Sequence, residues 1–134
     1  MKTSIIFLTT SGNTEELADV LKEAAEDKGM ETYISEVTAA DKDEFLSGDI
    51  LCFGSPAQGE EEVAEDVMDF VSDIGDSLSG KKVFMFGSYG WGGGEYMEAW
   101  TEIMTGYGAI LIHDPVTCLE APDEEVIETL KTVF

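Results

Sequence analysis

The sequence predicts an α/β fold in which a parallel β-sheet of five strands lies between two layers of helices. Short apolar runs alternate with segments of helical periodicity along all 134 residues. Several of these runs are continuously apolar, which is typical of parallel strands buried on both faces. Crossovers between such strands are right-handed and carry the helices to the faces of the sheet. Because no linker or repeat interrupts this pattern, we expect one domain over residues 1–134.

The first half of the chain predicts three strands and two helices. The strands are expected at residues 4–8 (SIIFL), 31–37 and 49–54 (DILCFG), since each run is short and rich in β-branched or aromatic residues. Apolar residues at helical spacing indicate a helix over residues 13–28, and a short helix is expected over 41–47.

The second half continues the alternation of helices and strands. Strands are expected at residues 82–87 (KVFMFG) and 109–112. A helix should precede the first of these strands, another should separate the two, and a short one should close the chain after Pro122. The apolar positions that indicate these three helices are Val63, Val67, Phe70, Val71, Ile74 and Leu78, then Met97, Trp100, Met104 and Tyr107, then Val126, Ile127 and Leu130.

The charge of the chain excludes several classes of partner. Seven lysines and no arginine face 29 carboxylates, which gives a net charge of −22. Nucleic acid and anionic membrane surfaces should repel such a protein, whereas a basic partner protein would be attracted. No apolar run approaches the roughly 18 residues of a membrane span, and no signal pattern precedes the first strand. Cys52 and Cys118 form no C-x-x-C pair, so we expect reduced thiols in a monomeric cytoplasmic protein.

A ligand site is expected at the carboxyl ends of the strands, near the point where the strand order reverses. The loops that lie there are residues 9–14, 55–61 and 88–94. In the first loop, hydroxyl and amide side chains surround a glycine at the start of a helix, where unpaired N–H groups bind phosphate without a cation. A helix start that is merely capped is the alternative, but one cap needs only one such residue. The residues concerned are Thr9, Thr10, Ser11, Gly12, Asn13 and Thr14.

Two common nucleotide motifs are absent from the first loop. A Walker loop requires a lysine that the loop lacks, and a dinucleotide fingerprint requires three glycines where Gly12 stands alone. Neutral donors without a cation favour a small monophosphate over a polyphosphate.

The three loops together resemble those of a known family. The stretch T-T-S-G-N-T is similar to the flavodoxin phosphate-loop signature [ST]-x-[ST]-G-N-T. The stretches GSPAQGEEE and FGSYGWGGGEYMEAW resemble the second and third flavin loops of short-chain flavodoxins of the clostridial type. The resemblance extends over nearly the whole chain, because the three motifs follow one another in the same order and at similar spacing as in that family. It implies a flavodoxin-like three-layer sandwich with strand order 2-1-3-4-5 and one noncovalently bound flavin mononucleotide (FMN).

The resemblance also implies roles for individual residues. Trp91 would cover one face of the isoalloxazine ring, a peptide flip at Gly59 would accept a hydrogen bond from the reduced ring, and Glu61 would accept from the ring N3–H. Two positions depart from the family pattern: Gln58 stands where relatives often carry methionine, and Glu120 where they place asparagine. The full set of expected cofactor-binding residues is Thr9, Thr10, Ser11, Gly12, Asn13, Thr14, Pro56, Ala57, Gln58, Gly59, Glu60, Glu61, Ser88, Tyr89, Gly90, Trp91, Gly92 and Glu120.

The function implied is that of a low-potential electron carrier without a substrate of its own. Such a protein would shuttle single electrons between the semiquinone and hydroquinone states of FMN, from a reductase to acceptor enzymes that carry basic docking patches. Carboxylates near the flavin would disfavour the added negative charge and lower the potential. A reductase or activator subunit dedicated to one target is the alternative function.

A phospho-acceptor receiver domain shares the same alternation of strands and helices, but its site residues are missing. Receivers need an acidic pair after the first strand and a lysine after the fifth, and this chain has Thr9-Thr10 and His113-Asp114 at those places.

Overall fold

The central sheet orders its strands as β2-β1-β3-β6-β7, and β8 also pairs with β6. Every pairing in this sheet is parallel. The structure is a computed structural model that describes residues 1–58, 62–90 and 94–134. The strands of the sheet are β1 (Lys2–Phe7), β2 (Glu31–Glu36), β3 (Ile50–Gly54), β6 (Lys82–Tyr89), β7 (Ile110–Leu111) and β8 (Val116–Leu119).

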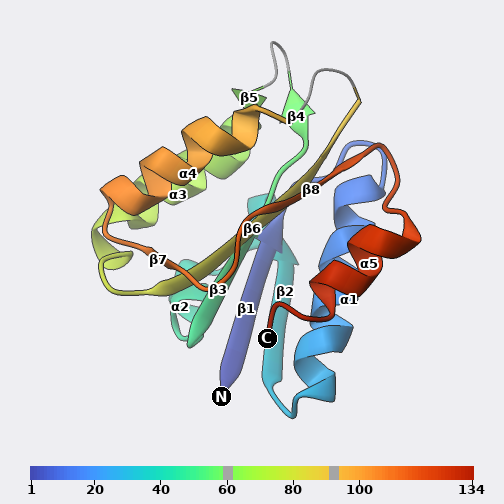
Figure 1. Cartoon of the computed structure of the whole chain (residues 1–134). Helices are drawn as coiled ribbons and strands as arrows, with labels where there is room; N and C mark the ends of the chain where they lie inside the picture. Colours follow the sequence, from blue (N-terminus) through green and yellow to red (C-terminus); the bar gives the residue numbers. More distant parts are fainter. Residues whose placement is uncertain (59–61, 91–93) are drawn as a thin grey trace.

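Helices cover both faces of the sheet, which gives the three layers seen in Figure 1. Leu17 and Leu21 of α1 and Leu130 of α5 belong to the core on one face, whereas α2, α3 and α4 pack on the other. The helices are α1 (Asn13–Asp27), α2 (Lys42–Leu46), α3 (Glu65–Ile74), α4 (Tyr96–Gly106) and α5 (Glu124–Leu130), with 3₁₀ turns at Val37–Ala39 and Gly75–Ser77. No helix in the described ranges is long and apolar enough to cross a membrane.

The predicted fold class and strand order are confirmed, with one refinement at the fifth position. The strand predicted at residues 109–112 is only Ile110–Leu111, which pairs with the start of β6. The upper half of β6 pairs instead with β8, a strand that was not predicted. Pro115 lies between the two segments and has no N–H to donate to a sheet, so the fifth position is filled by two short strands.

A small hairpin precedes α3 and was also not predicted. Strands β4 (Ala57–Gln58) and β5 (Glu62–Val63) pair antiparallel, with Ala57 opposite Val63. Val63 had been expected on the apolar face of the following helix, but that helix begins only at Glu65. The apolar spacing was correct for Val67, Phe70, Val71 and Ile74, which are all buried.

A close contact between β6, the end of β3 and the start of α4 depends on Gly87. The Tyr96 hydroxyl donates a hydrogen bond to the Ser55 carbonyl at 2.9 Å. A β-carbon at Gly87 would collide with both of these oxygen atoms. The contact therefore holds α4 and the loop after β3 against the upper part of β6, where the candidate site lies.

Replacing Gly87 by alanine should therefore destabilise the protein. We expect Gly87→Ala to lower the free energy of unfolding by about 1–3 kcal/mol, since the added methyl group has no space. Urea unfolding measures this change. Gly106→Ala is the matched control, because a β-carbon there would meet nothing within 4 Å. Equal stability of the two variants would contradict the packing described for Gly87.

Candidate cofactor site

The loop between β1 and α1 turns sharply at a glycine. Gly12 has a φ of 91°, which lies in the left-handed region that glycine adopts without strain. The Gly12 N–H donates to the Thr9 hydroxyl oxygen at 3.0 Å, and the Gly12 carbonyl accepts from Glu16 N–H at 3.0 Å. Thr10 and Ser11 are exposed at the tip of this loop. The turn thus starts the helix while leaving two hydroxyl groups free to face a ligand.

Helices α1 and α3 begin without a side-chain cap, whereas α2 and α5 are capped by aspartates. Asp41 caps α2 by accepting from Glu44 N–H, and Asp123 caps α5 by accepting from Val126 N–H. Gly12 occupies the cap position of α1 and provides no such bond. The first N–H groups of a helix carry a partial positive charge of about half a unit. The opening of α1 is therefore a place where an external anion can supply the missing acceptor.

A buried hydrogen bond joins the first loop to the third. The Thr14 and Ser88 hydroxyl oxygens are 3.2 Å apart, and both side chains are buried. Thr14 lies in the first turn of α1, whereas Ser88 lies near the end of β6. This bond fixes the distance between the two loops on either side of β3.

The loop after β3 is held at its base by Ser55. The Ser55 hydroxyl donates to the Pro56 carbonyl at 2.8 Å and accepts from the Ala64 N–H at 2.9 Å. The second of these bonds spans the β4–β5 hairpin. Ser55 thereby fixes where the hairpin begins and ends, and so where Ala57 and Gln58 lie.

Strand β8 brings a fourth segment to the site. It pairs with the end of β6, and the Glu120 N–H donates to the Tyr89 carbonyl at 2.7 Å. Glu120 has a φ of 57°, the one positive value at a non-glycine residue in the described part of the chain. A glutamate in this conformation is strained, and such strain is often found at binding sites.

A cavity of about 370 Å³ lies where these segments meet. This size falls within the usual range of small-molecule pockets. The first loop contributes hydroxyl and amide groups to its wall, and the remaining lining residues come from the loop after β3, the end of β6 and the residue after β8. Its lining residues are Thr10, Ser11, Asn13, Pro56, Ala57, Ser88, Tyr89, Gly90 and Glu120.

All of the lining residues were among those predicted from the sequence. The remaining predicted residues are of two kinds. Thr9, Gly12 and Thr14 support the first loop through the hydrogen bonds given above, and Gln58 lies in β4 without lining the cavity. The others fall outside the described residues and are Gly59, Glu60, Glu61, Trp91 and Gly92.

Three residues that organise the site were not predicted: Ser55, Gly87 and Tyr96. Ser55 and Gly87 lie within or beside expected loops, but nothing in the local pattern distinguishes them from ordinary loop residues. Tyr96 acts through a hydrogen bond to Ser55, which lies 41 residues away in the chain. Only the three-dimensional arrangement identifies their role.

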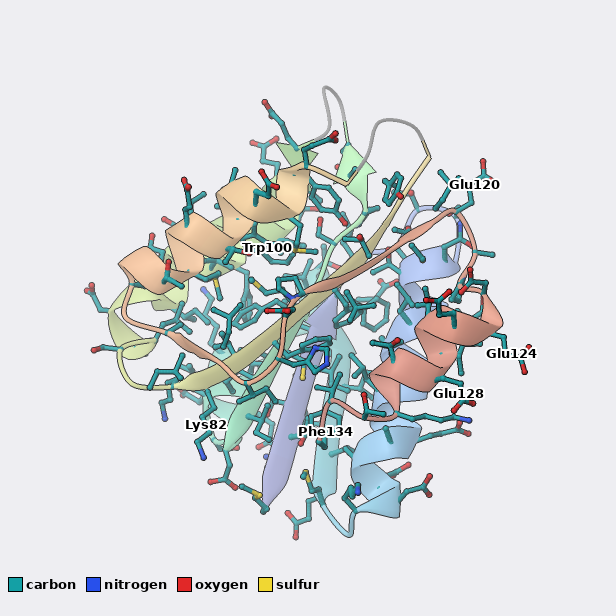
Figure 2. All side chains as sticks on the ribbon, viewed as in Figure 1. Lys82, Trp100, Glu120, Glu124, Glu128 and Phe134 are labelled. Atoms are coloured by element: carbon teal, nitrogen blue, oxygen red, sulfur yellow. The ribbon has the colours of Figure 1, made fainter. Side chains whose placement is uncertain are left out.

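The charges near the cavity fit a phosphate held by neutral donors. Among the described lining residues there is one carboxylate, Glu120, and no lysine. Lys82 begins β6 and lies at the opposite end of the sheet from Glu120, as Figure 2 shows. The uncapped helix start, the free hydroxyls and the flat side chains of Pro56 and Tyr89 suit a phosphomonoester that carries a planar group. FMN has this chemistry.

Neither cysteine side chain is a reactive thiolate. Both are free and buried, and burial raises the pKa of each thiol. The pKa of Cys118 rises to about 11 through burial and, to a lesser extent, the nearby carboxylates of Asp123 and Glu16. Cys118 therefore stays protonated at neutral pH, and its thiol donates to the Glu120 carbonyl at 3.3 Å.

The fold and the cavity define a doubly wound α/β protein with a small-molecule site at the carboxyl edge of its parallel sheet. Comparison with known proteins agrees with this class. A family model described as flavodoxin matches residues 5–131. A flavodoxin from Clostridium beijerinckii is 36% identical over 121 residues, which cover 90% of this chain and 88% of that protein.

Solved structures show the same relationship. The solution structure of two-electron reduced Megasphaera elsdenii flavodoxin superimposes with a TM-score of 0.89 at 33% identity, covering 98% of this chain and 96% of that one. The rubredoxin oxygen:oxidoreductase of Desulfovibrio gigas matches with a TM-score of 0.87 at 26% identity, but only over 34% of its length.

The chain belongs to the flavodoxin family, and its similarity to the Clostridium and Megasphaera flavodoxins supports the short-chain clostridial type. It is accordingly an FMN-binding electron carrier that exchanges electrons with redox partner proteins.

The strain at Glu120 leads to a stability prediction. Glu120→Asn should raise the free energy of unfolding by about 0.5–1 kcal/mol relative to Glu120→Gln, because asparagine tolerates the left-handed conformation better. Both variants remove the same charge, so the difference between their free energies of unfolding measures the cost of the left-handed backbone conformation. Urea unfolding of the two proteins measures it, and a glutamine variant as stable as the asparagine variant would show that the backbone is not strained.

Proposed function

We propose that the opening of α1 binds the phosphate of FMN and that the isoalloxazine ring lies between the loops after β3 and β6. The phosphate donors are the first N–H groups of α1 and the hydroxyls of Thr10, Ser11 and Thr14. Thr9 and Gly12 shape this loop, and Asn13 starts the helix. Pro56, Ala57 and Gln58 contact the ring from one loop, and Ser88, Tyr89 and Gly90 from the other.

The observation that carries the proposal is the uncapped α1, whose first turn faces a cavity lined by hydroxyl groups. Hydrogen bonds to a charged group contribute about 1.5–3 kcal/mol each. The distant carboxylates of this acidic chain are screened beyond about 8–10 Å in physiological salt. Local donors can therefore hold a phosphate despite the net charge of −22.

The roles implied for residues outside the described ranges stay part of the proposal. Trp91 would stack on the ring, with Gly92 allowing its loop to approach. Gly59 would supply the flipping peptide, and Glu60 and Glu61 would border the ring edge that carries N3–H. Glu120 would lie near the same ring.

We further propose a carrier of low potential with no substrate of its own. Several carboxylates lie around the carboxyl edge of the sheet. They belong to Glu62, to the first turns of α3 and α4, and to Glu120. One carboxylate about 12 Å away in a water-like dielectric opposes an added negative charge by roughly 0.35 kcal/mol. Four such groups lower a one-electron potential by about 60 mV before salt screening.

The same carboxylates suit reductases and acceptors with basic docking surfaces, which would form small, salt-sensitive interfaces with a monomeric carrier. The buried, unpaired cysteines are consistent with a cytoplasmic protein. No finding favours the alternative of a reductase or activator subunit dedicated to one target.

Removing two hydroxyl groups tests the phosphate assignment. The double variant Thr10→Ala with Ser11→Ala, at two exposed residues that line the cavity, should weaken FMN binding at least a hundredfold, because two hydrogen bonds to a charged group are lost. Titration of the apoprotein with FMN, followed by flavin fluorescence, gives the dissociation constant.

A control with the same two substitution types uses residues that do not line the cavity. Ser35→Ala with Thr105→Ala removes hydroxyls that bond only to nearby backbone carbonyls, and it should leave FMN affinity within twofold. If the site variant bound FMN as tightly as this control, the phosphate would have to bind elsewhere.

A further inference from the structure

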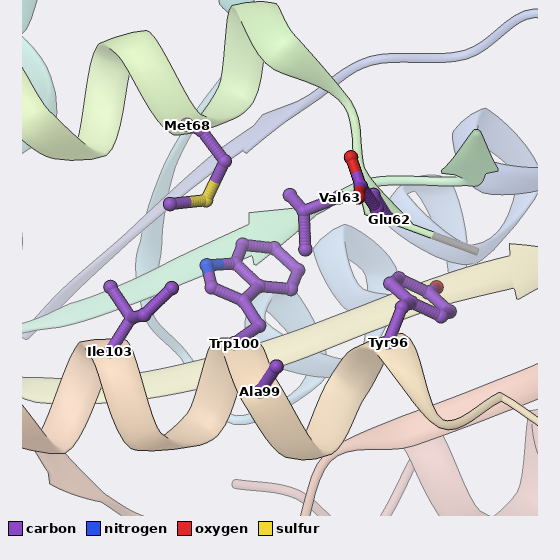
Figure 3. A pocket seen from close by; sticks show the side chains of 7 residues that line it. All are labelled: Glu62, Val63, Met68, Tyr96, Ala99, Trp100 and Ile103. Atoms are coloured by element: carbon purple, nitrogen blue, oxygen red, sulfur yellow. The ribbon is translucent and has the colours of Figure 1, made fainter. Parts of the chain in front are cut away.

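A second cavity lies on the opposite side of the β4–β5 hairpin, between α3 and α4. It has a volume of about 300 Å³ and is mainly apolar. Val63 and Met68 form one wall, and Ala99 and Ile103 of α4 form the other, as Figure 3 shows. The carboxylate of Glu62 stands at one end. We call this cavity the α3–α4 groove.

The floor of the groove contains a hydrogen-bond donor without an acceptor. Trp100 is completely buried, and its indole Nε1 has no hydrogen-bond partner among the described residues. Figure 3 shows this nitrogen pointing toward the space between the Met68 and Ile103 side chains. A buried N–H without an acceptor destabilises the folded protein, so a ligand that supplies an acceptor binds more tightly.

The side chains that cover the indole can move aside. Met68 is partly buried and unbranched, with several rotatable bonds that let it adopt new positions. Ile103, which also lines the groove, is 40% exposed. A ligand that displaces Met68 would therefore reach the indole N–H and cover Ile103 at the same time.

The charges around the groove select the kind of ligand. The charged side chains of α3 and α4 are all carboxylates, and Glu62 adds another at the end of the groove. Anionic ligands are repelled from such a surface, and cations are attracted. A suitable occupant thus combines an apolar group, a hydrogen-bond acceptor and a positive charge. A polypeptide segment provides all three as an apolar side chain, a backbone carbonyl and a neighbouring lysine or arginine.

We propose that the α3–α4 groove receives an apolar side chain from a basic segment of a protein that donates electrons to the carrier or accepts them. The apolar side chain takes the place of Met68, its backbone carbonyl accepts from the Trp100 indole, and a flanking cation pairs with Glu62. This inference rests on the proposed function, because the groove begins at Glu62, directly after the turn proposed to border the flavin. Docking there would bring the partner close to that turn.

Nuclear magnetic resonance of the FMN-loaded, ¹⁵N-labelled protein tests the groove directly. The probe is a blocked hexapeptide with one phenylalanine flanked by lysines. The Trp100 indole peak is assigned by comparison with Trp91→Phe, since the chain has two tryptophans. We expect this peak to move downfield and to saturate as the peptide is added. The same peptide with alanine for phenylalanine, or glutamates for the lysines, should bind at least tenfold more weakly.

Matched variants locate the binding surface. Ile103→Ala should weaken peptide binding at least fivefold, whereas Ile110→Ala, at an isoleucine that is 54% exposed outside the groove, should change it less than twofold. Glu62→Gln should weaken binding at least threefold, with Glu102→Gln on the exposed side of α4 as its control.

An indole peak that does not move would overturn the proposal, as would equal effects of the two isoleucine variants or equal binding of the glutamate peptide. The visible spectrum of the same sample distinguishes a failure of the groove proposal from a failure of the proposed FMN-binding function. Protein without bound flavin would contradict the proposed function, while the indole titration decides the groove independently.

Discussion

The open start of α1 is the constraint on which the rest of the site depends. A chain with 29 carboxylates caps α2 and α5 with aspartate, yet α1 starts at a glycine that has no side chain to offer. The left-handed conformation of Gly12 turns the chain into the helix, and the hydroxyl-bearing residues Thr10 and Ser11 line the cavity beside this turn. In the proposed function, the phosphate of FMN supplies the acceptor that this helix start lacks. Because such donors would contact the phosphate directly, they would outweigh surface carboxylates that solvent and salt screen.

The sheet contributes by holding separate loops at fixed distances from that helix start. Parallel pairing of β1, β3 and β6 places their carboxyl ends side by side, and a few buried polar contacts then fix the loops. The Thr14–Ser88 bond joins the first loop to the third, and the Tyr96–Ser55 bond joins α4 to the second. Gly87 permits the second contact because it has no β-carbon. The cavity is thus set by long-range contacts more than by any one loop.

Much of this could be predicted from the sequence because the relevant signals are local. Continuous apolar runs identified β1, β3 and β6, and the cluster of small polar residues around Gly12 identified the first loop. The hairpin at Ala57 and Val63 and the strand β8 were missed, since very short strands have too few residues to show a period. Ser55, Gly87 and Tyr96 were missed for another reason. Their roles come from contacts between residues far apart in the chain, such as the bond between Tyr96 and Ser55.

The most direct test of the proposed phosphate site compares the binding of FMN with that of riboflavin, which lacks the phosphate. The dissociation constants of both flavins for the apoprotein should be determined at the same pH and about 0.15 M salt. We expect FMN to bind at least a hundredfold more tightly than riboflavin, because riboflavin cannot form the charge-assisted hydrogen bonds to the phosphate. Equal affinities would contradict the central claim, because the opening of α1 would then contribute nothing to holding the cofactor.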